Sequence, residues 1–203
     1  MKERPILMSG EMVRAILAGR KTQTRRLVKP QPPWHLTIPM LTQNGWQFLS
    51  HPEQLHDTVP SFECPYGKVG DRLWLRETWD FRPWGQNNIG KRIVRFAYAA
   101  DGAQSHEVEI PEGWNPMLYN YERWRPSIHM PKIASRITLE VTNIRVERLQ
   151  DITEADIIKE GCPNEILYGT GWYRDLWNEI NGKKYPWSSN PFVWVIEFKR
   201  IIP

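Results

Sequence analysis

Long apolar runs are missing from this 203-residue sequence: no stretch approaches the roughly 20 residues that a membrane-spanning helix needs. The opening residues, MKERPILMSGEM, also lack the apolar segment and the small-residue cleavage pattern of a signal peptide. We therefore expect a cytoplasmic protein with no membrane partner.

Cysteine and histidine are scarce and scattered. Two cysteines, Cys64 and Cys162, are too few for a disulfide framework, and we expect both to be reduced. The five histidines show neither CxxC nor HExxH spacing, and the pair His51 and His56 is a weak signal at best. The sequence therefore predicts no metal site and no cofactor.

Positive charge is unevenly distributed. The net charge of the chain is +4, but residues 1–30 carry eight Lys or Arg against two acids, which leaves the remainder slightly negative. A local basic patch suits an anionic or nucleic-acid-like ligand. A solvated basic face is the alternative. The 11 tryptophans could stack on bases or fill the core, and their number does not decide between the two.

The basic segment ILAGRKTQTRR follows a predicted helix. Ser9 can cap a helix that runs through EMVRAILAG, and Gly19 fits its end. KTQTRRLV then reads as a strand, on which Thr24 and Arg26 share a face. Lys21 can join Thr24 only if it belongs to the turn after Gly19 rather than to the strand.

Strands dominate the remaining pattern. A helix opened by Thr153 with Asp156 as its capping-box partner, and a second over 171–182, interrupt them. Segments 30–66 and 101–130 read as irregular. Further strands are expected at 73–78, 92–101, 133–149 and 191–201. The absence of a βαβ rhythm predicts an α+β fold, a small and mostly antiparallel barrel with helices at its side.

Four sequence blocks carry a family resemblance. ILAGRKTQTRR, VGDRLWL, LQDITEADIIKEG and FVWVIEFK occur in an order that resembles the ASCH family. The most specific block is G-x-K-x-x-T-x-R, formed by Gly19, Lys21, Thr24 and Arg26. The resemblance implies one PUA-like domain over residues 1–203, with insertions at about 27–67 and 80–130, similar to the larger ASCH proteins of phages and prophages.

The small ASCH enzymes that hydrolyse N(4)-acetylcytidine have a proposed site of lysine, threonine and glutamate. Matched by motif, these residues fall on Lys21, Thr24 and Glu160. The resemblance therefore implies a metal-independent amidohydrolase whose substrate is a modified nucleoside, with Lys21 as the base, Thr24 as the nucleophile and Glu160 as the proton donor.

These roles make chemical demands on the sequence. A lysine base must be neutral, so its pKa near ~10.4 must fall by about three units, which corresponds to roughly 4 kcal/mol. Burial and the neighbouring Arg20, Arg25 and Arg26 act in that direction. Glu160 is expected in the last turn of its helix, where the helix dipole favours a protonated carboxyl group.

Four more residues are candidates for substrate binding: Arg26, Glu77, Trp79 and Tyr98. Arg26 could instead pair with an acid, Glu77 with an arginine, and the two aromatic residues could belong to the core. Taken singly, Lys21, Thr24 and Glu160 also have plain structural interpretations, as a helix-end cation, a strand threonine and an exposed helix residue.

Two other functions remain open. PUA-like folds often bind RNA, and a basic patch with many aromatic residues fits an RNA-binding module. A ribonuclease ranks lower, because the sequence offers no histidine pair or metal cluster to cleave RNA.

Overall fold

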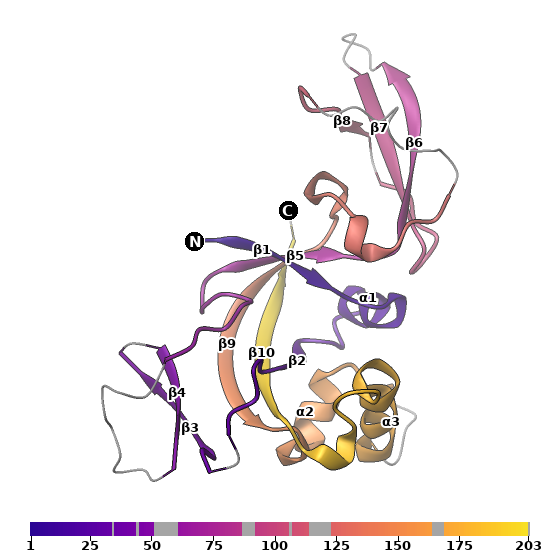
Figure 1. Ribbon diagram of the computed structural model, residues 1–203. Coiled ribbons are helices and arrows are strands. Elements are labelled where there is room, and N and C mark those ends of the chain that lie inside the picture. Colours follow the sequence, from indigo (N-terminus) through magenta and orange to yellow (C-terminus); the bar gives the residue numbers. More distant parts are fainter. Residues whose placement is uncertain are drawn as a thin grey trace.

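The computed structural model describes residues 1–33, 35–43, 45–50, 61–86, 92–105, 107–113, 123–163 and 169–202. Three β-sheets and three α-helices account for most of these residues (Figure 1). Over the same ranges, every helix is too short or too polar to cross a membrane.

The central sheet has five strands in the order β1-β5-β9-β10-β2. Their bounds are β1 Glu3–Leu7, β5 Arg72–Arg76, β9 Thr138–Arg148, β10 Phe192–Ile201 and β2 Gln23–Leu27. Only the edge pair β1 and β5 is parallel. The predicted segment 133–149 forms one long strand, β9, and its partner β10 carries a register shift between Glu197 and Phe198.

The sheet does not close, so the expected barrel is wrong, although the α+β class is confirmed. The edge strands β1 and β2 do not pair with each other in the part of the chain that the structure describes. The chain passes between these edges through α1, Gly10–Leu17, instead of through a strand pair. A barrel needs every edge to be paired, and here a helix takes the place of that last pairing.

Two smaller sheets occupy the segments expected to be irregular. β3, Ile38–Thr42, and β4, Gly45–Leu49, form a hairpin beside the central sheet. β6, Trp79–Gln86, β7, Arg92–Tyr98, and β8, Val108–Glu109, form a sheet at one end of the molecule (Figure 1). The expectation of loop structure throughout 30–66 and 101–130 is therefore wrong in part, since β3, β4 and β8 lie there.

The helices begin and end where the sequence predicts. Ser9 caps α1 by accepting a hydrogen bond from the Met12 amide at 3.3 Å. Thr153 and Asp156 form a reciprocal capping box at α2, Glu154–Lys159. The third helix is α3, Gly169–Asn181. Short 3-10 turns, which Figure 1 does not label, are η2 Ser127–His129, η3 Lys132–Ala134, η4 Leu149–Asp151 and η5 Trp187–Ser189.

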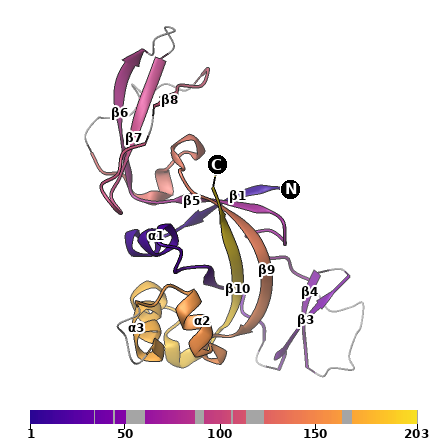
Figure 2. The same ribbon diagram turned by 180° about the vertical axis from the view of Figure 1, so that it is seen from behind.

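Strand β10 lies at the centre of the molecule because both of its faces are buried. Phe192, Trp194 and Ile196 join the main core, while Val193 and Val195 join the cluster under α2 and α3. Figure 2 shows the helices on one side of β9 and β10 and the β3–β4 hairpin on the other. This double burial explains the nearly continuous apolar run PFVWVIEF.

Candidate active site

Lys21 lies in the turn between α1 and β2, as the site requires. Gly19 has a φ of +74°, a left-handed conformation that suits glycine. The amide of Lys21 donates to the carbonyl oxygen of Ala15 at 3.1 Å, which closes the last turn of the helix. β2 begins only at Gln23, so the alternation of side chains between the two faces of the strand does not determine where Lys21 points.

The side chain of Lys21 is buried against Glu160, the residue at the C-terminus of α2. Its Nζ donates to the backbone oxygen of Glu160 and to Oε2 of the same residue, both at 2.8 Å. The exposed fractions of the two side chains are 0% and 3%. The structure therefore brings together two of the three predicted catalytic residues as a buried ion pair.

Gly161 allows the end of α2 to approach Lys21 this closely. It has a φ of +96°, and a Cβ at this position would lie 3.1 Å from Cβ of Lys21. Two further bonds fasten the end of α2 to the turn. The Thr22 amide donates to the Lys159 oxygen at 2.8 Å, and Nη1 of Arg20 donates to the Gly161 oxygen at 2.9 Å.

Arg25 occupies the other carboxylate oxygen of Glu160. Its Nη1 donates to Oε1 of Glu160 at 3.1 Å, and its Nη2 lies 2.5 Å from Glu147 and 3.2 Å from Asp156. Its guanidinium also lies over the ring of Tyr173, 5.9 Å from the centroid. Glu160 thus accepts hydrogen bonds from a cation on each oxygen.

Arg145 completes the charge balance on the outer side of this network. It donates to Glu147 and Asp156, each at 2.9 Å, and to Glu197 at 2.7 Å. The acids around Arg25 are therefore shared between two arginines. Burying charges is tolerable only with such pairing, because an isolated buried ion costs several kcal/mol or more.

The electrostatic setting lowers the pKa of Lys21. Burial is the largest cause, Glu160 opposes it, and the positive charges of Arg26 and Arg25 act with burial. This is the direction that a lysine base needs. Tyr173, which is buried beside the pair, has a pKa raised well above its ordinary value by burial and by Glu160, so its phenol stays neutral.

Thr24 faces a small cavity that Glu160 also lines. The cavity has a volume of about 20 Å³ and is walled by α1, β2, α2 and α3. A second cavity of about 40 Å³ lies against Glu160 as well. Glu160, Met12 and Leu176 line both cavities. The smaller space suits about one water molecule, whereas small-molecule sites usually measure about 300–1,000 Å³.

Arg26 lines the Thr24 cavity too. Its Nη2 donates to the Leu7 carbonyl oxygen at 2.6 Å, and its Nε is buried without a hydrogen-bond partner. Within the described ranges it forms no salt bridge, so the alternative of pairing with an acid is not observed. Arg26 therefore lines the cavity and retains one N–H donor without a partner.

Glu77, Trp79 and Tyr98 lie elsewhere. Glu77 accepts two hydrogen bonds from Arg136, at 2.8 and 2.9 Å, so the predicted alternative of an arginine salt bridge is what the structure shows. Trp79 and Tyr98 are buried in the core of the β6–β7 sheet, and the Tyr98 hydroxyl donates to Ala134. The structure does not bring these three residues to Lys21.

Several members of the network were not among the predicted site residues, including Arg25 and Tyr173. Arg25 was expected only to tune Lys21 from nearby, yet it is a direct partner of Glu160. Two adjacent arginines on a strand point to opposite faces, so one of Arg25 and Arg26 had to turn inward. Tyr173 shares a buried helical stripe with Trp177, four residues later, a spacing that is typical of core packing.

The described residues offer no group of three or more His, Cys, Asp or Glu side chains that could hold a metal ion. Cys64 and Cys162 are both free and buried.

No protein-family model matches the chain, and no curated protein matches it. Two solved structures are similar to it. The ASCH domain of Lactobacillus crispatus JV V101 has 11% identity and a TM-score of 0.42, over 98% of this chain and 79% of that one. A DUF984-family protein of Enterococcus faecalis V583 has 10% identity and a TM-score of 0.40, over 99% and 80%. One of these structures thus carries the name of the family that the sequence motifs predict.

Proposed function

We propose that this protein is an amidohydrolase that removes the acyl group from N(4)-acylated cytosine nucleosides. The observation that carries the proposal is the buried Lys21–Glu160 pair at 2.8 Å, with Thr24 on the cavity that Glu160 lines. The sequence resemblance assigns these same three residues to the reaction, although Glu160 is far from Lys21 and Thr24 in the chain.

The ion pair supplies a base and an acid in one proton transfer. Moving a proton from Nζ of Lys21 to Oε2 of Glu160, along their hydrogen bond, leaves a neutral amine and a carboxylic acid. Burial lowers the pKa of Lys21 and so favours loss of its proton. The neutral amine can then accept the hydroxyl proton of Thr24.

Acyl transfer follows from these protonation states. Oγ of Thr24 attacks the acyl carbonyl carbon while its proton passes to Lys21. As the bond between that carbon and N4 breaks, Glu160 gives its proton to the departing amine. An acyl ester on Thr24 and a free cytosine nucleoside remain, and the Lys21–Glu160 ion pair is restored. The unpartnered Nε of Arg26 can donate to the carbonyl oxygen as it becomes negative.

Hydrolysis of the ester uses the same proton transfers through Lys21 and Glu160, with water as the nucleophile. The neutral Lys21 amine takes a proton from water, whose oxygen attacks the ester carbon, and Thr24 leaves with a proton. The carboxylic acid is released and Thr24 recovers its hydroxyl group. The overall reaction consumes one water molecule and needs no cofactor.

The resting site is closed to a nucleoside. Cavities of about 20 and 40 Å³ cannot hold one, so side chains that line both, such as Met12 and Leu176, must move before substrate binds. Closure has a chemical use, because it keeps bulk water away from the Lys21–Glu160 pair.

The direct test is the release of cytidine from N(4)-acetylcytidine. Lys21→Ala, Thr24→Ala and Glu160→Ala should each abolish it, while Thr22→Ala, an exposed threonine two residues from Thr24, should retain it. Unchanged activity in all three site variants would remove the assignment.

RNA binding receives less support from the basic segment than its charge predicts. Lys21 and Arg25 are internal partners of Glu160 and are unavailable to phosphate. Binding through this segment would depend on its remaining cations, Arg20 and Arg26, and should weaken steeply with salt.

A further inference from the structure

A cavity larger than the two beside Glu160 lies away from the Lys21 site, next to the β3–β4 hairpin. Its volume is about 470 Å³, within the range of about 300–1,000 Å³ typical of small-molecule sites. Its walls come from β1, the hairpin, the segment 62–71 and Ile144 of β9. It shares no lining residue with the cavities at Glu160.

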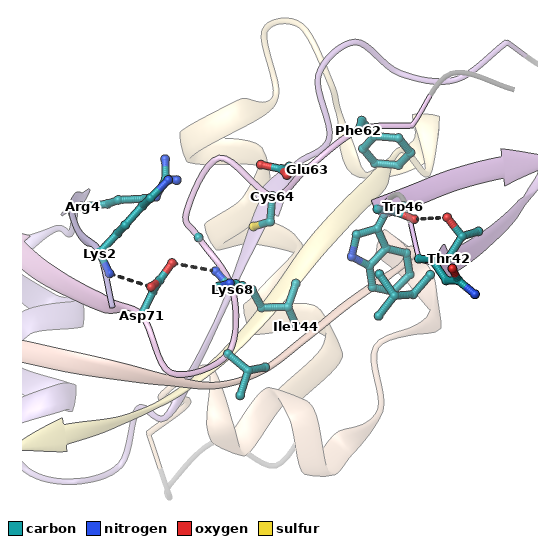
Figure 3. A pocket seen from close by; sticks show the side chains of 15 residues that line it. Lys2, Arg4, Thr42, Trp46, Phe62, Glu63, Cys64, Lys68, Asp71 and Ile144 are labelled. Carbon is teal, nitrogen blue, oxygen red and sulfur yellow. Dashed lines mark hydrogen bonds between the residues drawn. The ribbon is translucent and has the colours of Figure 1, made fainter. Parts of the chain in front are cut away.

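One end of this cavity is cationic. Lys2, Arg4 and Lys68 line it, and Figure 3 shows them grouped near Asp71. The carboxylate of Asp71 is already engaged by backbone amides, those of Lys2 at 2.7 Å and Lys68 at 3.2 Å. Among the described residues, the ammonium groups of Lys2 and Lys68 have no carboxylate partner. This end can therefore attract an anion.

The other end is aromatic. The half-buried rings of Trp46 and Phe62 lie there (Figure 3). Their backbones exchange hydrogen bonds at 3.0 and 2.8 Å, and both rings contact Trp194, with centroids at 5.9 and 5.4 Å. The two rings are thus held in place before any ligand arrives. Gln43, on the same wall, adds an amide that can donate and accept.

The thiol of Cys64 also lines the cavity. Burial raises its pKa to about 11, so it is a neutral thiol at physiological pH and a poor nucleophile. The chemistry of this cavity is therefore that of binding.

We propose that this cavity is a nucleotide site, with the phosphate at Lys2, Arg4 and Lys68 and the base against Trp46 and Phe62. A nucleotide has the same two-ended character as the cavity, because its anionic group and its flat aromatic group lie at opposite ends of one small molecule. Aromatic side chains bind bases by stacking, and lysines bind phosphate through charge. The site is independent of the proposed hydrolase reaction.

Calorimetric titration with cytidine monophosphate and with adenosine monophosphate at low salt tests the proposal. We expect binding of either nucleotide, weaker binding of the matching nucleoside and of inorganic phosphate, and a loss of affinity as salt rises. The same titration is repeated with a single-stranded tetranucleotide. If the tetranucleotide binds more tightly than the mononucleotide, the nucleotide that the site recognises belongs to a nucleic-acid strand. No binding at millimolar nucleotide, or phosphate binding as tightly as nucleotide, would overturn the proposal.

Matched variants locate the binding. Lys2→Glu with Lys68→Glu should weaken nucleotide binding by about tenfold or more, since both phosphate contacts are reversed in charge. Lys29→Glu with Lys183→Glu changes the charge equally at exposed positions outside the cavity and should change the affinity far less. Equal losses in the two double variants would overturn the proposal.

Trp46→Ala should weaken nucleotide binding more than phosphate binding. Because Trp46 also contacts Trp194, its thermal unfolding must be compared with that of the unaltered protein. Gln43→Ala, at an exposed side chain, tests the same end of the cavity without a change to the core.

Discussion

Nζ of Lys21 lies 2.8 Å from Oε2 of Glu160, and neither side chain has more than 3% of its surface exposed. A charge in such a place depends on its partner. Removing one member of a buried pair typically costs about 3–5 kcal/mol, whereas replacing both members with uncharged groups is often neutral.

Glu160→Gln should therefore lower the free energy of unfolding by about 3 kcal/mol, because it leaves Lys21 and one donor of Arg25 without a carboxylate. Lys21→Met combined with Glu160→Gln should recover much of that loss. Urea unfolding of the two single variants and the double variant measures the coupling. If the two single losses simply add in the double variant, the pair is not coupled as the structure indicates.

Gly161→Ala should be more damaging than Gly70→Ala, another substitution at positive φ. Forcing a left-handed residue costs about 1–2 kcal/mol by itself. Here the new Cβ would also lie 3.0 Å from Cβ of Ala15 and 3.1 Å from Cβ of Lys21. Gly70→Ala is the matched control, with a φ of +86° and no atom within 4 Å of its Cβ. Equal losses of unfolding free energy in the two variants would show that the contact with Lys21 is unimportant.

Three of the strands that sequence analysis missed share one feature. β1, β3 and β6 each contain a proline, at Pro5, Pro39 and Pro83. Proline usually argues against a central strand because it cannot donate a ladder hydrogen bond. All three strands lie at sheet edges or in the two-stranded hairpin, where that missing donor is tolerated. A local sequence pattern does not distinguish an edge strand from a loop. It therefore also does not show whether a sheet stays open or closes into a barrel.

The candidate site was more predictable than the fold. The caps at Ser9 and Thr153 and the turn at Gly19 are local signals, and they correctly place Lys21 and Glu160 at the ends of their elements. The role of Arg25 depends on Glu147 and Glu160, which come from β9 and α2. No local pattern reports which strand and helix meet, so that contact was not predicted.

Opening the site should increase its efficiency. Met12→Ala with Leu176→Ala shortens two side chains that line both cavities beside Glu160. If only a small fraction of the protein is in the open conformation, increasing that fraction should raise kcat/KM for N(4)-acetylcytidine about threefold or more, mainly by lowering KM. Ile180→Ala, which trims the wall of one cavity alone, is the control. A fall in kcat/KM with intact folding would contradict the view that these side chains block entry.

The pH dependence of hydrolysis should be bell-shaped. The relay needs one proton shared between Lys21 and Glu160, so a second proton stops it at low pH and loss of the shared proton stops it at high pH. Because burial lowers the pKa of Lys21, the alkaline limb should lie below the ordinary lysine value of about 10.4.

Arg26→Gln should move the alkaline limb of this pH profile in a definite direction. The charge of Arg26 lowers the pKa of Lys21, so its removal should raise that pKa and move the alkaline limb upward. A loss of substrate binding alone would lower the rate without moving the limb. An alkaline limb that stays in place would contradict the coupling between the two residues.

The most direct measurement is intact-protein and peptide mass spectrometry after rapid acid quenching of the protein with N(4)-acetylcytidine. The account predicts an acetyl ester on Thr24 that forms as cytidine is released, and that is absent in Thr24→Ala and in Lys21→Met. Thr22→Ala should still form it. Release of cytidine by Thr24→Ala at the normal rate, or an acetyl group carried by another residue, would contradict the account.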